Sequence, residues 1–292
     1  MSLEIRDLLL SAQWLGHMDE ILRLCPGEAH TARKTPPHPQ THRQSRFFGA
    51  FEDTRLVAFR EFLSHRILHR GEKRLMFQSC QGATHPSYHG CGLFSRIIDY
   101  AKTALAQEGD YLVGFPDDES QWITLNRLGF NRVDLTRFYA PCTPASFSTC
   151  LLDPDVYAAA LVDQSMIKID QYAMASWQQC QHPEEIVRHE YLTNFVWGRI
   201  VQRRLLGRTV RVLHAGGCEL NKPWLLAETL RSLRRAVGVS LVRFECTKDS
   251  PLAQAWRWQI GRARTGPWIW CALRNTSDGV KFDAHAGAKD IY

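Results

Sequence analysis

A turn with two glycines separates a strand-like segment from a helix-like segment, and this turn constrains the fold more than any other feature. It lies within residues 84–94, which read THPSYHGCGLF. The preceding residues 74–80 have the composition of an extended strand. After the turn, apolar side chains recur at helical spacing at Leu93, Phe94, Ile97, Ile98, Ala101, Ala104 and Leu105. The sequence therefore predicts a strand, a tight turn and a helix that begins just after Gly92.

Such a turn can form a binding site for an anion. The first N–H groups of a helix have no partner within the helix, and the helix dipole places partial positive charge there. Phosphate groups bind at such ends, and Gly90 and Gly92 would let the backbone approach one closely because they have no Cβ atom. The spacing is neither G-x-x-x-x-G-K-[ST] nor G-x-G-x-x-G followed about 20 residues later by an acid. A nucleoside triphosphate and NAD are therefore disfavoured.

The turn resembles the acyl-CoA pyrophosphate loop of the GNAT N-acetyltransferase superfamily. That loop has the pattern V-x-P-x-[YH]-[RQ]-x-x-G-[LI]-[GA], often with a further glycine, and residues 84–93 follow it closely as T-x-P-x-Y-H-G-C-G-L. Thr84 stands where valine is usual, His89 where arginine or glutamine is usual, and Phe94 where a small residue is commoner. None of these departures removes a backbone donor.

The residues that follow extend the resemblance. Residues 110–116 predict a buried strand, and residues 119–128 predict a short helix that ends at Gly129, a residue suited to the left-handed conformation at helix ends. GNAT proteins end this helix with the same Gly-Phe pair, here Gly129 and Phe130. The run FPDDES at 115–120 is also similar to an F-P-N-x-x-S motif of a subset of the family, with Asp117 in place of asparagine.

The chain is long enough for two such units. Residues 1 to about 141 contain two predicted helices, a β-hairpin at 46–63, and then a strand, a helix, a strand, a helix and a strand. We expect an acyl-CoA-binding GNAT domain at 1–141 and a second GNAT-like domain at 150–292 that lacks the cofactor loop. The expected fold class is α/β (α+β), and each domain would be a mixed, mostly antiparallel twisted sheet flanked by helices.

The second half repeats part of this order. A helix is predicted at 225–237, a strand at 239–246, a helix at 251–260 and a strand at 268–273. The matching turn at 214–223 carries Glu219 and lacks the glycine spacing of an anion site. Four tryptophans are more typical of a core than of an acceptor pocket: Trp256, Trp258, Trp268 and Trp270.

Composition agrees with a globular enzyme. Of the 292 residues, 45% are hydrophobic and 23% are charged, which suffices for a sizeable core. Polar residues interrupt the first 24 residues, and no run approaches the roughly 18 apolar residues of a membrane span, so we expect a cytoplasmic protein. The nine cysteines form no C-x-x-C pair, which predicts reduced thiols and no metal site. The net charge of +6 comes without a nucleic-acid-binding motif, so no nucleic acid partner is expected.

Residues 31–46, TARKTPPHPQTHRQSR, predict a loop because prolines and polar residues replace apolar ones. Two interpretations of this segment stay open. It is either a solvated linker or, as the resemblance implies, a lid on the acceptor side.

The resemblance implies an N-acetyltransferase, which would move an acetyl group from acetyl-CoA to a primary amine of a small molecule or peptide by direct attack. CoA would be the product. In this family the strand before the loop hydrogen-bonds the pantetheine arm, and a backbone N–H polarises the thioester carbonyl; these roles map to Ala83 and Thr84. The resemblance also permits a homodimer. It implies that the cofactor contacts Ala83, Thr84, His89, Gly90, Cys91, Gly92, Leu93 and Phe94.

Catalysis needs a general base or a water relay, because only a neutral amine attacks a thioester. The candidates for the base are Glu61, Asp117 and His85. The usual acid of the family is a tyrosine four residues before the Gly-Phe pair, and Leu125 occupies that position. This substitution favours the alternative, a non-catalytic acyl-CoA-binding or scaffold protein. An aminoacyl transferase that uses charged tRNA is disfavoured by the well-formed glycine loop.

Overall fold

The computed structural model describes residues 3–9, 11–25, 45–116, 118–142, 152–163, 165–181, 184–205, 207–257, 263–274 and 280–285. The chain divides into two compact units. The first contains residues 1–66, 74–132 and 269–276, and the second contains residues 67–73, 133–268 and 277–292. The domain limits expected from the sequence, 1–141 and 150–292, stay predictions.

The first unit is built on a twisted sheet with the strand order β1-β2-β3-β4-β5-β12. The pairs β1–β2 and β2–β3 are antiparallel, whereas β4 and β5 are parallel. The predicted hairpin is confirmed as β2 and β3, but a strand at the N-terminus, β1, precedes the first helix and was not predicted. The elements in chain order are β1 (Leu3–Leu8), α1 (Ala12–Leu24), β2 (Ser45–Glu52), β3 (Arg55–His69), β4 (Glu72–Thr84), η1 (Pro86–Tyr88), α2 (Leu93–Leu105), β5 (Tyr111–Gly114) and α3 (Asp118–Asn126).

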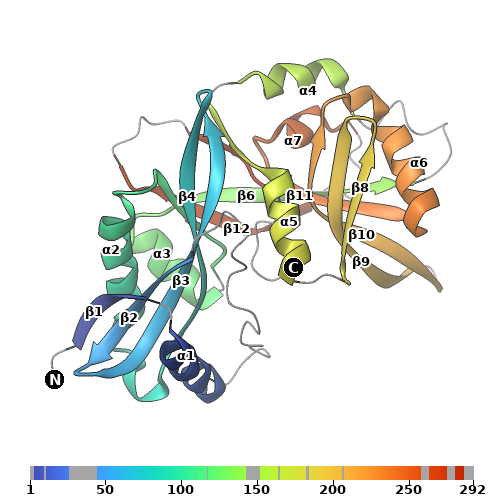
Figure 1. Cartoon of the computed structure of the whole chain (residues 1–292). Coiled ribbons are helices and arrows are strands. Elements are labelled where there is room, and N and C mark those ends of the chain that lie inside the picture. The colour runs from blue at the N-terminus through green and yellow to red at the C-terminus, as the bar shows by residue number, and fades with distance from the viewer. Residues whose placement is uncertain are drawn as a thin grey trace. The chain divides into compact units, whose positions relative to one another are not determined.

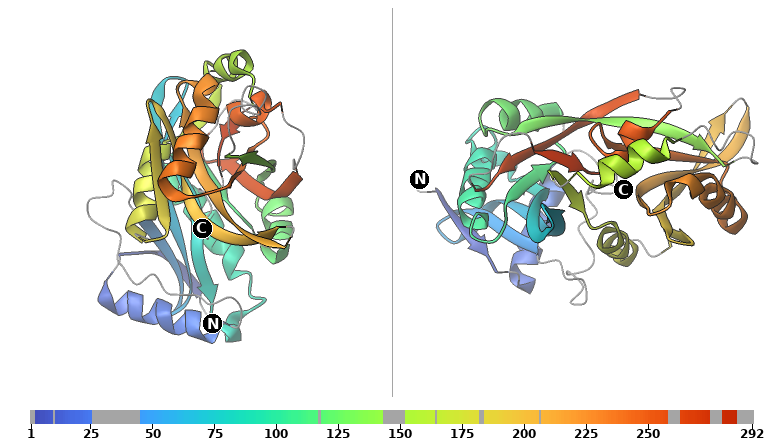
Figure 2. Two further views of the ribbon diagram at one scale, coloured as in Figure 1. Left: turned by 90° about the vertical axis from the view of Figure 1, so that its right-hand side faces the viewer. Right: turned by 90° about the horizontal axis from the view of Figure 1, so that it is seen from above.

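Two helices cover opposite faces of this sheet (Figures 1 and 2). Helix α1 packs Met18, Ile21 and Leu22 against one face. Helix α2 presents Leu93, Ile97, Ile98, Ala101 and Leu105 to the other face, as its apolar periodicity predicted. The two faces of the sheet are therefore covered by different helices.

The second unit contains the strand order β6-β11-β10-β9-β8. Strands β8, β9 and β10 form an antiparallel meander, and β11 lies parallel to β10. A short parallel pair, β7 and β13, lies off this path. The elements are β6 (Asn131–Pro141), α4 (Pro154–Leu161), β7 (Met166–Ile169), α5 (Gln171–Gln181), β8 (Ile186–Tyr191), β9 (Asn194–Leu205), β10 (Arg208–Leu220), η3 (Pro223–Leu225), α6 (Leu226–Val237), β11 (Leu241–Thr247), α7 (Pro251–Ala255), β12 (Ala263–Ala272) and β13 (Lys281–Asp283).

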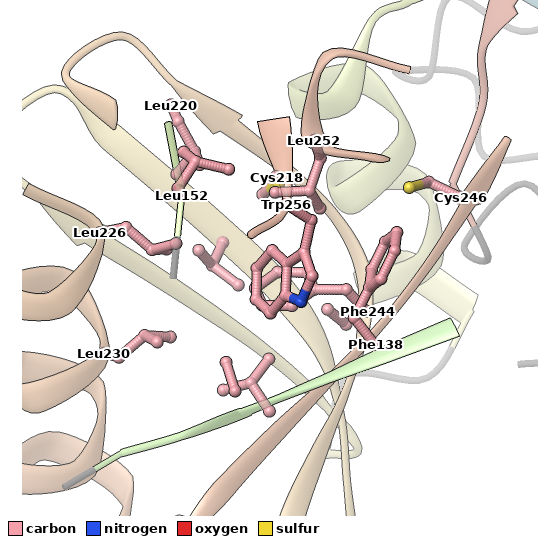
Figure 3. Close-up of a cluster of buried hydrophobic side chains, with 14 of the residues drawn as sticks. Phe138, Leu152, Cys218, Leu220, Leu226, Leu230, Phe244, Cys246, Leu252 and Trp256 are labelled. Atoms are coloured by element: carbon pink, nitrogen blue, oxygen red, sulfur yellow. The ribbon is translucent and has the colours of Figure 1, made fainter. Parts of the chain in front are cut away.

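One face of this second sheet holds the main core of the unit (Figure 3). The indole of Trp256 stacks on Phe138 with 5.1 Å between ring centroids, and it lies 6.0 Å from the ring of Phe244. Leucines from α6 and β10 complete the cluster, among them Leu220 and Leu230. Trp256 and Trp268 are buried, as the sequence predicted, and Trp258 lies outside the described residues.

Both units contain the same parallel strand–helix–strand arrangement. In the first, α2 connects β4 to β5; in the second, α6 connects β10 to β11. The antiparallel neighbour of each pair comes from the other half of the sequence, because residues 269–272 of β12 pair with β5 and residues 135–141 of β6 pair with β11. The strand at 268–273, which the sequence analysis placed in the second domain, therefore contributes its pairing to the first unit.

Some predicted features lie outside the described residues. Only the last two residues of the 31–46 loop are described, so neither of its two interpretations is tested. Cysteine pairing can be judged only in the described part of the chain, where seven cysteines, from Cys25 to Cys271, are free thiols. In the same part, none of the helices combines the length and apolar character needed to cross a membrane.

Candidate active site

The glycine turn lies at the start of α2, with open space in front of its two glycines. Strand β4 ends at Thr84, a 3-10 turn follows, and Gly92 is the N-terminal cap of the helix. Gly90 and Gly92 have φ values of +78° and +69°, a conformation that side chains disfavour. A Cβ atom built on either glycine would meet nothing within 4 Å. Both glycines therefore serve the backbone conformation, and the space in front of them is open.

Several amides of this turn donate hydrogen bonds within it, and others have no acceptor among the described residues. The N–H of His89 donates to Pro86 O at 3.1 Å, and that of Cys91 donates to Tyr88 O at 3.3 Å. Gly92 makes no side-chain cap, and among the described residues no hydrogen bond engages the amides of Gly90 or Gly92. The first turn of α2 adds further donors that a helix cannot satisfy internally. We call the backbone of residues 90–94 the cradle.

Side chains from the β2–β3 hairpin fix the turn that carries the cradle. Tyr88 Oη donates to Glu52 Oε2 at 2.6 Å, and burial and this hydrogen bond to a carboxylate raise the pKa of Tyr88, the hydrogen bond most. Arg55 Nη2 lies 3.2 Å from His85 Nε2. Glu52 and Arg55 flank the turn of the β2–β3 hairpin. This hairpin therefore contacts the segment before the cradle at two residues, His85 and Tyr88. The sequence did not predict these partners.

Tyr88 therefore anchors the loop, and we expect Tyr88→Phe to weaken acetyl-CoA binding. We expect roughly a tenfold rise in Kd, because the loop loses the hydrogen bond to a carboxylate that holds it. Calorimetric titration with acetyl-CoA and with pantetheine should show the loss for acetyl-CoA only, because the arm without phosphates does not use the cradle.

Glu52→Gln should reproduce the effect, and the double variant should be no worse than either single variant. Tyr100→Phe is the control, since Tyr100 lies on α2 of the same unit and is 40% exposed. Equal losses for acetyl-CoA and pantetheine would refute an anchoring role specific to the cradle.

The strand before the cradle extends beyond its parallel neighbour. The last pair between β4 and β5 is Ser79 with Gly114, where β5 ends, and β4 continues to Thr84. The backbone of residues 80–84 thus lacks β5 as a partner. Ala83 and Thr84 lie in this stretch, and Thr84 O accepts a hydrogen bond from His89 Nε2 at 2.9 Å.

Phe94, one of the departures from the family pattern, has a structural partner. The Arg60 guanidinium lies 4.8 Å above the centre of its ring, within the range of a cation–π contact. Arg60 Nε also donates to Ser79 Oγ at the last pair between β4 and β5. Gly82 makes room for this arginine, because a Cβ atom there would lie 3.1 Å from Arg60 Cγ. Phe94 therefore helps to fix the first turn of α2 over β4.

The two described candidates for the base, Glu61 and His85, are not brought together. Glu61 is 1% exposed on β3 and accepts a hydrogen bond from Ser45 Oγ at 2.7 Å. The N–H of His85 donates to Val57 O on the same strand, four residues from Glu61, and at about 3.3 Å per residue this corresponds to roughly 13 Å along β3. Asp117 lies outside the described residues, and Leu125 packs at the edge of the core under α2.

The matching turn of the second unit has no open cradle. Helix α6 begins after Leu225, which has a φ of −92°. Asn194 closes the turn, because its Oδ1 accepts from the N–H of Lys222 at 2.9 Å and its Nδ2 donates to Lys222 O at 2.9 Å. Elsewhere in this unit a cavity of about 870 Å³ lies beside the end of α6, and its walls include Glu185, Arg199 and Arg211. None of the predicted site residues lines it.

The fold is that of known N-acetyltransferase structures. The chain matches a GCN5-related N-acetyltransferase from Anabaena variabilis with a TM-score of 0.61 and 11% sequence identity. The match covers 93% of this chain and 73% of that one. Eis1 from Mycobacterium abscessus matches with a TM-score of 0.58 and 12% identity, and the match covers 93% of this chain and 74% of Eis1. A probable N-acyltransferase from Enterococcus faecalis matches with a TM-score of 0.57 and 10% identity, and the match covers 94% of this chain and 73% of that one.

A family model also matches part of the sequence. Residues 19–134 match the model described as an acetyltransferase (GNAT) domain. This segment contains the hairpin, strand β4, the cradle and the helix that follows it, so the first half of the chain is similar to a GNAT acetyltransferase domain. A search of curated proteins found no significant match.

Proposed function

We propose that the protein is an acyl-CoA-dependent N-acyltransferase that moves an acetyl group from acetyl-CoA to a primary amine of a small molecule or peptide. The observation that carries this proposal is the cradle, which follows strand β4 at the start of α2 and combines two left-handed glycines with amides that no described residue engages. Backbone amides at a helix N-terminus suit a pyrophosphate. The GNAT domain match supports the same chemistry.

In this proposal the chain contributes binding and alignment more than covalent chemistry. The amides of residues 90 and 92–94 hold the phosphates, and the backbone at Ala83 and Thr84 holds the extended arm. Alignment of an amine with a thioester accounts for much of the rate, because the enzyme converts a bimolecular step into one within a complex. The amine attacks the carbonyl carbon directly, and the C–S bond breaks to release CoA after the amine has lost its proton.

The proton requires an acceptor, and Glu61, Asp117 and His85 are the proposed candidates. Glu61 is a buried carboxylate and His85 has an imidazole ring at the start of the loop. With Leu125 at the usual tyrosine position, the departing thiolate has no tyrosine donor there. The same substitution favours the second candidate function, a non-catalytic acyl-CoA-binding protein.

Two measurements on the wild-type protein separate these functions. Calorimetric titration with acetyl-CoA tests the site, and thiol release in the presence of a panel of amines, amino sugars and peptides tests transfer. Binding together with amine-dependent thiol release supports the enzyme. Binding without release by any amine supports the binding protein, and no binding overturns both.

Among the candidates for the base, Glu61 offers the sharpest test. We expect Glu61→Gln to lower kcat by about 10²–10⁴-fold, the usual contribution of a general base, with little change in the Kd of acetyl-CoA.

Ser45→Ala is the matched control, since it removes one hydrogen-bond partner of Glu61 and leaves the carboxyl in place. Unchanged kcat in Glu61→Gln would exclude this residue as the base. The same assay on Asp117→Asn and His85→Gln would then decide between the other two.

A further inference from the structure

The sheet of the second unit has a polar cluster on the face opposite its apolar core. Strands β6, β11 and β10 lie side by side here (Figure 1). Phe138, Val242 and Leu213 point into the core on one face. On the other face, the register pairs Arg137 with Glu245 across β6 and β11, and His214 with Arg243 across β10 and β11. Directly paired residues share a face, so these four side chains lie on the same side of the sheet.

A buried carboxylate orients two arginines in this cluster. Glu245 is 1% exposed, and its Oε2 accepts from Arg137 Nε at 3.2 Å, Arg137 Nη2 at 3.1 Å and Arg243 Nη2 at 2.7 Å. The side chains of Arg137 and Arg243 remain 31% and 21% exposed. In the described part of the chain, Arg137 Nη1 donates to no protein group. The two guanidinium groups are therefore held in place while some of their donors face solvent.

The charges in the cluster do not cancel. Two arginines and one glutamate leave a net positive charge, and Arg203 on β9 adds to it. The pKa of the neighbouring His214 falls to about 4 in these surroundings. Burial lowers it most, and the positive charges of Arg243, Arg203 and Arg137 lower it further. The negative charge of Glu245 only partly opposes them. His214 is thus neutral near pH 7, and its Nδ1 lies 3.4 Å from Arg243 Nη1.

We propose that Arg137 and Arg243 form a binding site for an oxyanion, the phosphate or carboxylate group of a small ligand. Planar guanidinium groups bind such oxyanions through paired N–H donors. Glu245 prevents the arginines from moving, which lowers the entropy that binding would otherwise cost. The site lies in the second unit and uses none of the residues assigned to acyl-CoA, so it does not depend on the proposed transferase activity.

His214 provides a direct measurement of occupancy. We would follow its ring proton by NMR as the pH is varied, and identify the signal by its loss in His214→Gln. Adding inorganic phosphate or trifluoroacetate, a carboxylate that stays ionised where His214 titrates, should raise the pKa of His214 by about one unit, because an anion close by favours the protonated ring. Chloride at matched ionic strength should produce a smaller change.

Variants then locate the effect. Removing one arginine alone would leave a buried carboxylate with less compensation and could unfold the unit. The double variant Arg137→Gln with Glu245→Gln keeps the net charge and removes the charged hydrogen bonds between Arg137 and Glu245, so it should bind neither anion. Arg208→Gln, on the exposed start of β10, is the control and should bind as the wild type does.

Each outcome of this experiment either supports or overturns the proposed oxyanion site. A response to phosphate alone assigns a phosphate site, and a response to trifluoroacetate alone assigns a carboxylate site. No response to either anion in the wild type, an equal response to chloride, or a full response in the double variant would each overturn the proposal.

Discussion

Gly92→Glu should weaken acetyl-CoA binding by at least about 100-fold, which corresponds to roughly 2.7 kcal/mol. Two physical effects act together. Gly92 has a φ of +69°, and a residue with a Cβ atom in this conformation costs about 1–2 kcal/mol. The new carboxylate would also lie in the open space before the helix, where repulsion between two charges at 4 Å amounts to about 1–4 kcal/mol at the dielectric constants of a protein surface or water. Calorimetric titration measures the loss.

Two controls separate charge, strain and general damage. Gly129 has a φ of +67° and open space around its Cβ direction, so Gly129→Glu introduces the same strain and charge away from the cradle. It should bind acetyl-CoA as the wild type does. Gly92→Ala introduces strain without charge and should fall between wild type and Gly92→Glu. Wild-type affinity in Gly92→Glu would refute the cradle as the phosphate site.

Trp256→Ala should lower the free energy of unfolding by about 3–5 kcal/mol, the usual cost of truncating a buried large aromatic residue. Trp256 is 3% exposed and stacks on Phe138 at the centre of the main core of the second unit (Figure 3). Its removal leaves a cavity that leucines from several elements would have to fill. Chemical denaturation followed by circular dichroism measures the change.

Trp256→Phe should cost much less than this. The indole Nε1 of Trp256 is buried without a hydrogen-bond partner among the described residues, and an unsatisfied buried donor costs about 1–3 kcal/mol. Phenylalanine removes that donor and keeps most of the aromatic packing. Trp224→Ala is the control for tryptophan loss in the same unit, since Trp224 is 62% exposed and should change stability little. Equal losses in Trp256→Ala and Trp224→Ala would contradict the assigned core.

Much of the cradle could be predicted because its determinants are local. Helix α2 begins at Leu93 and ends at Leu105, as the apolar spacing indicated, and both turn glycines have positive φ. The hairpin before it and the helix after it were also predicted. Such features depend on residues a few positions apart, so periodicity and glycine placement suffice to find them.

The anchors of the cradle could not be found in this way. Glu52 on β2 contacts Tyr88 across 36 residues of sequence, and Arg60 on β3 contacts Phe94 on helix α2. Neither arginine nor glutamate in a hairpin carries a local signal for such a role. The departure at Phe94 was visible in the sequence, but its partner Arg60 became evident only when β3 and α2 were placed in the same unit.

Sequence alone therefore determined the GNAT-like order of elements, the conformation of the glycine turn and the apolar faces of the helices. Tertiary structure decided which strands pair: β12 joins β5, β6 joins β11, and that second pairing brings Arg137 to Glu245. The physical reason is that backbone conformation and side-chain periodicity are short-range properties of the chain. Strand pairing brings together segments more than a hundred residues apart, and only the complete fold selects among the partners that strand patterns allow.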